Sequence, residues 1–235
     1  MARSINITKL EIIQTATRLF FSQGFSKTTA SLLSKEVGIS TGNLTFYFPT
    51  KEHILQVLVE MMCEFQWKIM EEHTDEGKSS LLSYCLELAT MVAISEENEQ
   101  MRDFYLSSYT LPMTLEIIRE NDLQKTKQVF GEYCKDWKED QFVEAETIVS
   151  GIEYATLMTT KHSAQIDKRV EGALRAIMLF YGVPEEIRDK KIAKILAMDY
   201  KTIGKRMLES FKTFAEETTE NAIEEKINSI RNKNK

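Results

Sequence analysis

Cysteine, histidine, proline and glycine are scarce in this sequence, and each scarcity excludes a class of protein or structure. The three Cys and three His residues are scattered over 235 residues, so no zinc-ligand spacing is present. Cys63, Cys85 and Cys134 are odd in number, and we expect either buried reduced thiols or a redox sensor. With only three Pro and nine Gly the chain has few turn signals, which favours long helices.

Recognisable catalytic and membrane signals are also missing. The sequence holds no Ser-His-Asp or Cys-His arrangement, no Gly-rich phosphate loop and no HExxH motif. It therefore predicts no catalytic residue, no metal site and no cofactor. No apolar run approaches the roughly 18 residues of a membrane span, and the first residues lack the apolar core of a signal peptide. We expect a cytoplasmic, non-enzymatic protein that does not associate with membranes.

The charge is unevenly distributed along the chain. The net charge is −6, yet residues 1–51 hold six basic and two acidic residues, a balance of +4, which leaves −10 for the rest. A basic head can neutralise phosphates while an acidic body stays away from DNA. The distribution therefore favours a nucleic-acid partner despite the negative total. The basic residues of the head are Arg3, Lys9, Arg18, Lys27, Lys35 and Lys51.

Two short capped helices follow a longer amphipathic one near the N-terminus. Either Thr28 or Thr29 can cap the first short helix, which Gly38 ends because glycine readily adopts a positive φ. Ser40 caps the second short helix, over residues 41–47. This is the layout of a helix-turn-helix, whose second helix enters the major groove of DNA.

The second short helix has one apolar and one polar face. Leu44 and Phe48 lie four residues apart and are expected to point inward. The opposite face carries hydroxyl, amide and phenol groups that can hydrogen-bond base edges or phosphate oxygens, and a glycine that permits close backbone approach. The residues expected on this outward face are Thr41, Gly42, Asn43, Thr45 and Tyr47.

This segment resembles the DNA-binding domain of the TetR/AcrR family of bacterial transcriptional regulators, over about residues 8–56. The resemblance implies an all-α fold with a three-helix helix-turn-helix domain at 1–50 and a larger helical domain for ligand binding and dimerisation at 51–235. Two positions depart from the commonest family pattern, because Ser34 replaces a small Ala and Thr45 replaces a frequent aromatic residue. The matching residues are Ala16, Leu19, Phe20, Gly24, Phe25, Thr28, Thr29, Leu33, Val37, Gly38, Ile39, Ser40, Gly42, Leu44, Tyr47, Phe48, Lys51 and Glu52.

The resemblance also implies roles for individual residues on double-stranded operator DNA. In the family, the capping Thr and the Tyr and Lys that follow the recognition helix hold phosphates. Exposed residues of the recognition helix read bases, which here implies Thr41, Asn43 and Thr45. The complete set expected at the DNA is Thr28, Thr29, Ser40, Thr41, Gly42, Asn43, Thr45, Tyr47 and Lys51.

Helical periodicity continues through the rest of the chain. One long helix is predicted from Lys51 to about residue 73. It begins at the basic head and ends in the body. A helix start is predicted at about residue 111, and a separate helix over 122–136. Further long helices are predicted over residues 141–163 and 168–181, and two more follow Pro184, over about 185–196 and 200–230.

Methionine and aromatic residues are frequent in the middle helices. They form either ordinary core or the walls of a pocket for a bulky apolar ligand. Because regulators of the family usually sense small molecules, the resemblance implies a small apolar or amphipathic effector. Glu153 and His162 lie on a helix expected to face inward and could be its polar handles, or else a core histidine with satisfied hydrogen bonds or a surface pair. The candidate pocket residues are Met62, Phe65, Tyr84, Phe104, Tyr105, Tyr109, Phe130, Tyr133, Tyr154, Met158 and His162.

The resemblance further implies a homodimer, formed as a four-helix bundle by the two helices that precede Gly182. Small residues on these helices permit close approach and apolar residues supply contact area, although the same faces could instead bury the monomer's own core. The candidate interface residues are Ile148, Gly151, Ile152, Ala155, Thr159, Ala173, Ile177 and Phe180.

Taken with the resemblance, these features imply a ligand-responsive repressor. It would bind a palindromic operator as a dimer and be released by a small molecule. The sequence leaves open an activator, and also a chromosome-organising or division-linked DNA-binding protein built on the same fold.

Overall fold

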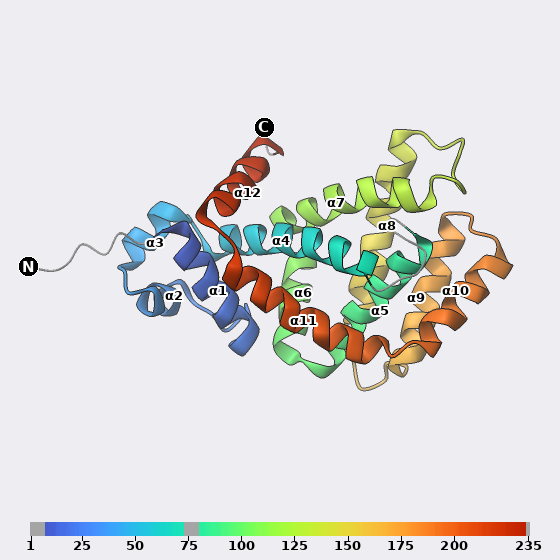
Figure 1. The fold of residues 1–235 in the computed structure, drawn as a ribbon, viewed down its shortest axis with the longest axis horizontal. Coiled ribbons are helices and arrows are strands. Elements are labelled where there is room, and N and C mark those ends of the chain that lie inside the picture. The colour runs from blue at the N-terminus through green and yellow to red at the C-terminus, as the bar shows by residue number, and fades with distance from the viewer. Residues whose placement is uncertain (1–7, 73–79, 234–235) are drawn as a thin grey trace, which may run out of the picture.

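Twelve α-helices and no strands make up the part of the chain that the computed structural model describes, residues 8–72 and 80–233. Three short helices form one end of the molecule, and the long α4 runs from them into an elongated body (Figure 1). The all-α prediction is confirmed. The predicted end of α4 at residue 73 lies outside the described residues. The first elements are α1 (Lys9–Gln23), α2 (Ala30–Val37), α3 (Thr41–Tyr47) and α4 (Lys51–Glu72).

The body is built around α5, which is apolar almost throughout and buried along nearly its whole length. A helix that is apolar on all sides needs neighbours on all sides, and α5 contacts α4, α6, α7, α8, α9, α10 and α11. None of the described helices is both long and apolar enough to cross a bilayer. The body helices are α5 (Leu81–Glu97), α6 (Glu99–Thr110), α7 (Pro112–Phe130), α8 (Glu139–Leu157), α9 (Ile166–Phe180) and α10 (Glu185–Ala197).

Side-chain caps set the boundaries of the helix-turn-helix. The Thr29 hydroxyl accepts from the Leu32 N–H at 3.1 Å, and the Ser40 hydroxyl accepts from the Asn43 N–H at 3.1 Å. Both bonds satisfy amides of the first turn that have no partner within the helix. Gly38 ends α2 in the left-handed conformation, with φ of 82°. Of the two threonines that could cap α2, the structure therefore selects Thr29.

Three predicted helix boundaries are wrong. α7 begins at Pro112, which confirms the start predicted near residue 111, but it continues unbroken to Phe130, so the separate helix predicted over 122–136 is wrong. α8 ends at Leu157 instead of continuing to Ser163. Beyond α8, the Ser163 hydroxyl accepts from the Thr160 N–H at 2.8 Å, and such local bonds compete with the helical ones.

The C-terminal helix predicted over 200–230 is broken in two. α11 (Tyr200–Glu217) ends at Thr218, whose ψ of 154° is extended. The Thr219 hydroxyl then accepts from the Ala222 N–H at 3.3 Å and starts α12 (Glu220–Lys233). The break turns α12 back onto α1 and α4, where Ile223 is fully buried.

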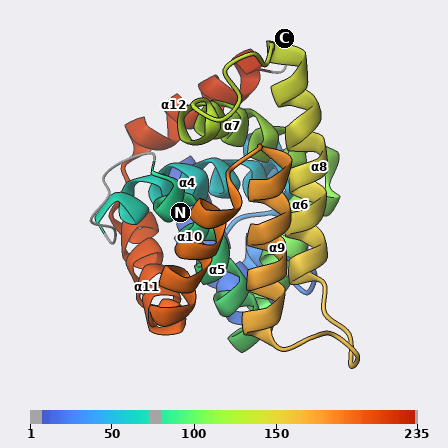
Figure 2. The same ribbon diagram turned by 90° about the vertical axis from the view of Figure 1, so that its right-hand side faces the viewer.

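α8 and α9 lie side by side at the end of the molecule opposite the helix-turn-helix (Figure 2). α10 packs against α9 and α5, and α11 packs mainly on α5. The helices after Pro184 therefore cover the body and reach the helix-turn-helix end of the molecule.

Candidate nucleic-acid interface and effector cavity

The recognition helix α3 presents a polar face to solvent. Leu44 is buried beneath the helix, while Thr41, Gly42, Asn43 and Thr45 are exposed. Thr29 and Ser40 are also exposed at the helix caps, and Tyr47 is half-buried at the end of α3. Most residues predicted to contact DNA therefore share one surface.

Thr28 is an exception to this arrangement. Its side chain is fully buried, and its hydroxyl donates to the Gly24 carbonyl at 2.8 Å and accepts from the Gln23 amide at 3.0 Å. A phosphate contact requires an accessible hydroxyl, so the prediction for Thr28 is wrong. Its bonds instead hold the turn between α1 and α2.

Lys51 is tied into the protein more strongly than the sequence suggested. Its ammonium donates to the carbonyls of Phe25 and Thr28, at 2.9 and 3.0 Å, and lies 4.1 Å from the centre of the Phe25 ring. Hydrogen bonds from a charged donor are about twice as strong as neutral ones. Lys51 thus fastens the first turn of α4 to the turn before α2, and one of its three N–H donors remains for a phosphate.

Phe46 is a functional candidate that the sequence pattern did not indicate. Its side chain is 83% exposed, more than any other large apolar side chain in the described residues. It lies on α3 and meets the Tyr47 ring edge-on, with ring centroids 5.5 Å apart. The sequence offered one indication of this exposure, because Phe46 is not on the helix face that Leu44 and Phe48 share. An exposed phenyl group on a recognition helix can contact the methyl group of thymine.

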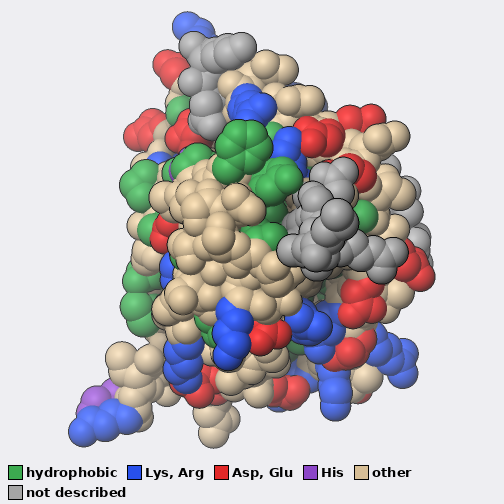
Figure 3. Space-filling model, turned by 90° about the vertical axis from the view of Figure 1, so that its left-hand side faces the viewer, with side chains coloured by type: hydrophobic (Ala, Val, Ile, Leu, Met, Phe, Trp, Pro, Cys, Tyr) green, Lys and Arg blue, Asp and Glu red, His purple; other side chains and the backbone are tan. Residues whose placement is uncertain are grey.

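The surface around α3 is mostly uncharged. Figure 3 looks onto this end of the molecule, whose centre is largely polar side chain and backbone, with Lys and Arg side chains nearer its margins. Of the basic residues predicted for the head, Lys27 and Lys35 are exposed, whereas Lys9 is bound 2.5 Å from Glu224 of α12. Arg3 lies outside the described residues.

A cavity of about 50 Å³ lies inside the body, between α4, α5, α6, α7 and α8. Its volume exceeds the share of one water in the liquid, about 30 Å³, but not that of a bulky ligand. Apolar and aromatic side chains form much of its wall. Five of the predicted pocket residues line it: Met62, Tyr84, Phe104, Tyr105 and Tyr109.

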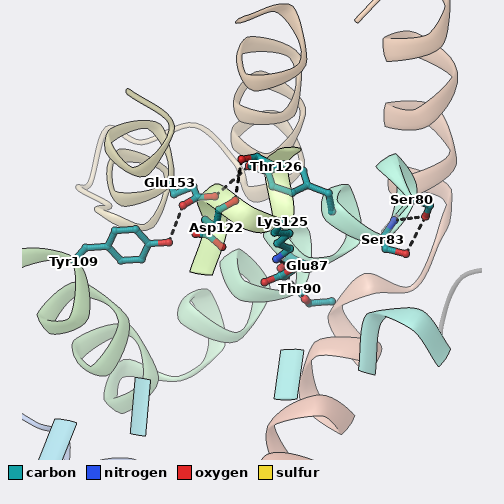
Figure 4. A network of polar contacts seen from close by, with 10 residues as sticks. Ser80, Ser83, Glu87, Thr90, Tyr109, Asp122, Lys125, Thr126 and Glu153 are labelled. Carbon is teal, nitrogen blue, oxygen red and sulfur yellow. Dashed lines mark hydrogen bonds and ion pairs between the residues drawn. The ribbon is translucent and has the colours of Figure 1, made fainter. Parts of the chain in front are cut away.

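Charged side chains also line this cavity, and the sequence analysis did not predict most of them. Lys125 forms an ion pair with Glu87, and Glu153 accepts from the Tyr109 hydroxyl at 2.8 Å. Figure 4 shows Asp122 next to Glu153, with Lys125 pointing toward Glu87. Charged residues are usually exposed, which is why sequence patterns assign these side chains to the surface.

Burial changes how readily these carboxyl groups ionise. Loss of hydration raises the pKa of Glu153 to about 7, and the charge of Glu146 contributes to this rise. Burial likewise raises the pKa of Asp122, against the opposing effect of Lys125, and Glu153 adds to the rise. Burial alone would lower the pKa of Lys125, but Glu87 and Asp122 raise it above its ordinary value. At neutral pH Glu153 is therefore only partly ionised.

Six predicted pocket residues lie elsewhere. Phe65 packs against the rings of Phe211 and Phe214, and Phe130 stacks on Tyr181 with ring centroids 4.1 Å apart. These aromatic residues belong to the packed core. Of the remaining four, Tyr133 lies in the turn after α7 and Tyr154 on α8. Met158 and His162 lie in the exposed connection after α8, which ends earlier than predicted.

Two structural paths connect the cavity to the DNA-binding head. α4 lines the cavity with Met62 and begins at Lys51, which is bonded to the head. Phe104 of α6 lines the cavity and contacts Phe21 of α1 edge-on, with ring centroids 5.4 Å apart. Asp103 of α6 also accepts from Ser26, in the turn between α1 and α2, at 2.7 Å from its N–H. The helices of the cavity wall are therefore in direct contact with α1 and with the turn between α1 and α2.

The outer faces of α8 and α9 expose apolar and small residues. Ala173 and Ile177 are buried in the protomer, so their prediction as interface residues is wrong. A side chain at Gly151 or Gly172 would meet nothing within 4 Å. The exposed large apolar residues of these two helices are Val143, Ile148, Leu179 and Phe180. Among the other predicted interface residues, Gly151 and Ala155 are exposed, whereas Ile152 and Thr159 are half-buried.

The chain is similar to known bacterial proteins in its N-terminal part. The family described as "Bacterial regulatory proteins, tetR family" matches residues 12–58. The uncharacterized HTH-type transcriptional regulator YuxN of Bacillus subtilis is 28% identical over 119 residues, which is 48% of this chain and 41% of YuxN. This chain thus aligns with less than half the length of that relative.

Two further similarities extend over more of the chain. The nucleoid occlusion factor SlmA of Vibrio campbellii is 26% identical over 165 residues, which cover 70% of this chain and 80% of SlmA. The crystal structure of a gamma-butyrolactone receptor (ArpA like protein) has 17% identity and a TM-score of 0.45, over 86% of this chain and 96% of that chain.

The family match coincides with the structural unit described above. Residues 12–58 run from α1 through the recognition helix into the first turns of α4. The matched family is one of regulatory proteins, in agreement with the prediction that the chain is not an enzyme. With its capped helix-turn-helix followed by a helical body, this chain carries at residues 12–58 the domain of the family described as bacterial regulatory proteins, tetR family.

Proposed function

We propose that this protein is a DNA-binding transcriptional regulator that places α3 in the major groove of a palindromic operator. The observation that carries the proposal is the exposed face of α3, where Thr41, Asn43 and Phe46 surround a helix anchored by buried Leu44. Amide and hydroxyl groups bond base edges, and a phenyl group contacts a thymine methyl. Thr29, Ser40, Tyr47 and Lys51 flank this face and are proposed to hold phosphates.

The regulator is proposed to act as a homodimer through α8 and α9. Gly151 and Ala155 lie four residues apart on the exposed face of α8, and Gly172 lies on the exposed face of α9. Neither glycine has a neighbour within the protomer that would require the absence of a side chain. Glycine weakens a helix interior, so close approach of a second copy would explain its presence. Such a dimer would space the two α3 helices about one turn of DNA apart, about 34 Å.

A small apolar or amphipathic effector is proposed to release the DNA from this dimer, which would make the protein a ligand-responsive repressor. Its binding to the cavity would displace α4 and α6, and both helices contact the head through Lys51 and Phe104. The dimer would exchange between a state whose two α3 helices fit the operator and a state in which their spacing does not fit. An effector releases the DNA only if it binds more tightly to the second state.

The first test is selection of bound fragments from the genome of the source bacterium by the purified protein at physiological salt. We expect a short palindrome upstream of a few genes. Asn43→Ala should change the preferred sequence, at a discrimination of about 1–3 kcal/mol for the base it contacts. Asn228→Ala, an exposed amide on α12, is the matched control and should select the same sites. Identical selection by all three proteins would refute the role of α3.

The dimer is tested separately. Gly151→Leu adds a large side chain where the protomer itself has free space, so folding should be unaffected and the dimer weakened. Sedimentation velocity over a range of concentrations should show a raised dissociation constant and circular dichroism an unchanged helix content. An unaltered dimer would exclude this face as the interface.

The alignment with SlmA favours one alternative function, because it covers 80% of that nucleoid occlusion factor. A protein of that kind would bind many sites dispersed over the chromosome and organise or protect it during division. The same fragment selection separates the two functions. Few promoter-proximal sites support a regulator, and many dispersed sites far from promoters support the alternative.

A further inference from the structure

The cavity in the body has an unbalanced charge. Among the described residues, three carboxyl groups line it, those of Glu87, Asp122 and Glu153, and one ammonium group, that of Lys125. Lys125 is ion-paired with Glu87, and its charge also acts on Asp122 and Glu153. Three carboxyl groups therefore share a single ammonium group in a mostly apolar surrounding. No group of metal-binding side chains occurs in the described residues, so a metal ion is a poor candidate for their counter-charge.

Two uncharged polar side chains also line the cavity. They are Gln66 and Tyr105, which are 7% and 5% exposed. Within the described part of the chain neither side chain is engaged in a hydrogen bond, so both are available to a molecule in the cavity. These groups can accept hydrogen bonds from a bound molecule through the Gln66 carbonyl and the Tyr105 oxygen.

The rest of the wall suits an apolar body. Met62 and Met91 are flexible side chains that can move aside, and Phe104 and Ile118 are buried apolar neighbours. The aromatic faces of the wall can also attract a cation. Lys125 shows that the cavity tolerates one, since its ammonium lies 5.7 Å from the centre of the Tyr84 ring.

From this arrangement we infer that the cavity binds a protonated primary or secondary amine that carries an apolar body. The ammonium lies between Asp122 and Glu153 and donates its N–H groups to them, to Gln66 or to Tyr105. The apolar part occupies the space that Met62 now fills. The role of this amine as the effector rests on the proposed function. Its binding to the cavity is independent of that function.

The charge preference follows from Coulomb's law in a medium less polar than water. A cation is attracted by both carboxylates and holds them ionised, whereas an anion is repelled. A neutral molecule of the same shape gains the apolar contacts only. A quaternary ammonium gains the charge but has no N–H group to donate. The amine should therefore bind more tightly than each of these three relatives.

Calorimetric titration of the full-length protein at pH 8 tests this ranking. The probe is 4-phenylbutylammonium, and its matched relatives are 4-phenylbutanol, 4-phenylbutanoate and trimethyl(4-phenylbutyl)ammonium. We expect the dissociation constant of the primary ammonium to be lower by about tenfold or more than that of the alcohol. Equal binding of the alcohol and the ammonium would overturn the inference. Equal binding of the two ammonium ions would overturn the role of the N–H donors.

Isosteric variants locate the site. Asp122→Asn and Glu153→Gln should each weaken binding of the ammonium by about tenfold while affinity for the alcohol stays within about threefold. Glu116→Gln, on the exposed face of α7, is the matched control and should behave as wild type. Unchanged ammonium binding in both cavity variants would overturn the site. If either fails to fold by circular dichroism, Tyr105→Phe decides, because it removes one hydroxyl and should still weaken ammonium binding.

A mobility-shift assay with a selected operator separates this inference from the proposed function. Ammonium binding without loss of operator affinity would support the cavity assignment and refute the effector role. Normal operator binding with no ammonium binding would refute the cavity assignment and leave the DNA-binding function intact.

Discussion

Glu153→Gln should stabilise the protein, although it removes a charged side chain from a hydrogen-bonded network. In the folded protein burial raises the pKa of Glu153 from 4.5 to about 7. The ionised carboxylate is therefore disfavoured by folding. A glutamine keeps an oxygen that can accept from Tyr109, whose hydroxyl lies 2.8 Å from the carboxylate.

The sign and size follow from proton linkage. Because the folded pKa lies above the unfolded one, the carboxyl's contribution to stability is complete below about pH 4.5 and is lost as pH rises through about 7. A rise of one in the pKa corresponds to about 1.4 kcal/mol, so the loss of stability from this group is about 3 kcal/mol. The glutamine variant lacks this loss and should be more stable than wild type at pH 8 by a similar amount.

Urea unfolding followed by circular dichroism, at pH 5, 6, 7 and 8 and one fixed protein concentration, measures the effect. Asp122 and Glu146 also have raised pKa values, so the stability of wild type should depend on pH through these groups too, and the useful quantity is the difference between variant and wild type. That difference should grow from pH 5 to pH 8. Glu116→Gln, on the exposed face of α7, is the control for the Glu-to-Gln substitution itself. A difference that is the same at pH 5 and pH 8 would refute the assignment of a raised pKa to Glu153.

Three further predictions concern the head and its attachment. Phe46→Ala should weaken operator binding in a mobility-shift assay. Replacing the contacted thymine by uracil should weaken wild-type binding by about 1 kcal/mol, the contribution of one methyl group, and leave binding by the variant unchanged. Equal effects of uracil on both proteins would argue against the contact. Lys51→Met keeps the stem but loses the bonds to the carbonyls of Phe25 and Thr28, so the thermal midpoint should fall and DNA binding weaken even at low salt; a loss that vanishes at low salt would indicate a phosphate contact alone. Ile223→Ala opens a cavity under α12, where the side chain is fully buried, and should lower the free energy of unfolding by about 2–5 kcal/mol in urea titrations; a loss below about 0.5 kcal/mol would mean that α12 is not docked on the head in solution.

Local signals were enough to predict the head of this protein. Thr29, Gly38 and Ser40 cap or end helices through bonds to residues a few positions away, so their roles are legible in the sequence. The spacing of Leu44 and Phe48 predicted which face of α3 is buried. Phe46 was missed because apolar residues are by default assigned to the interior, and only the packing of α3 shows that its ring has no cover.

Tertiary structure decided what local patterns do not encode. Asp122, Lys125 and Glu153 are charged, and only the crossing of α7 and α8 brings them to one cavity. Thr28 and Thr29 are equivalent as caps by sequence, and the burial of Thr28 under the turn distinguishes them. Ala173 and Ile177 have the composition of an interface, but the rotation of α9 turns them into the protomer. Helix caps and periodicity are short-range properties of the chain, whereas burial, charge pairing and cavities depend on which distant helices meet, and that is decided only when the whole core packs.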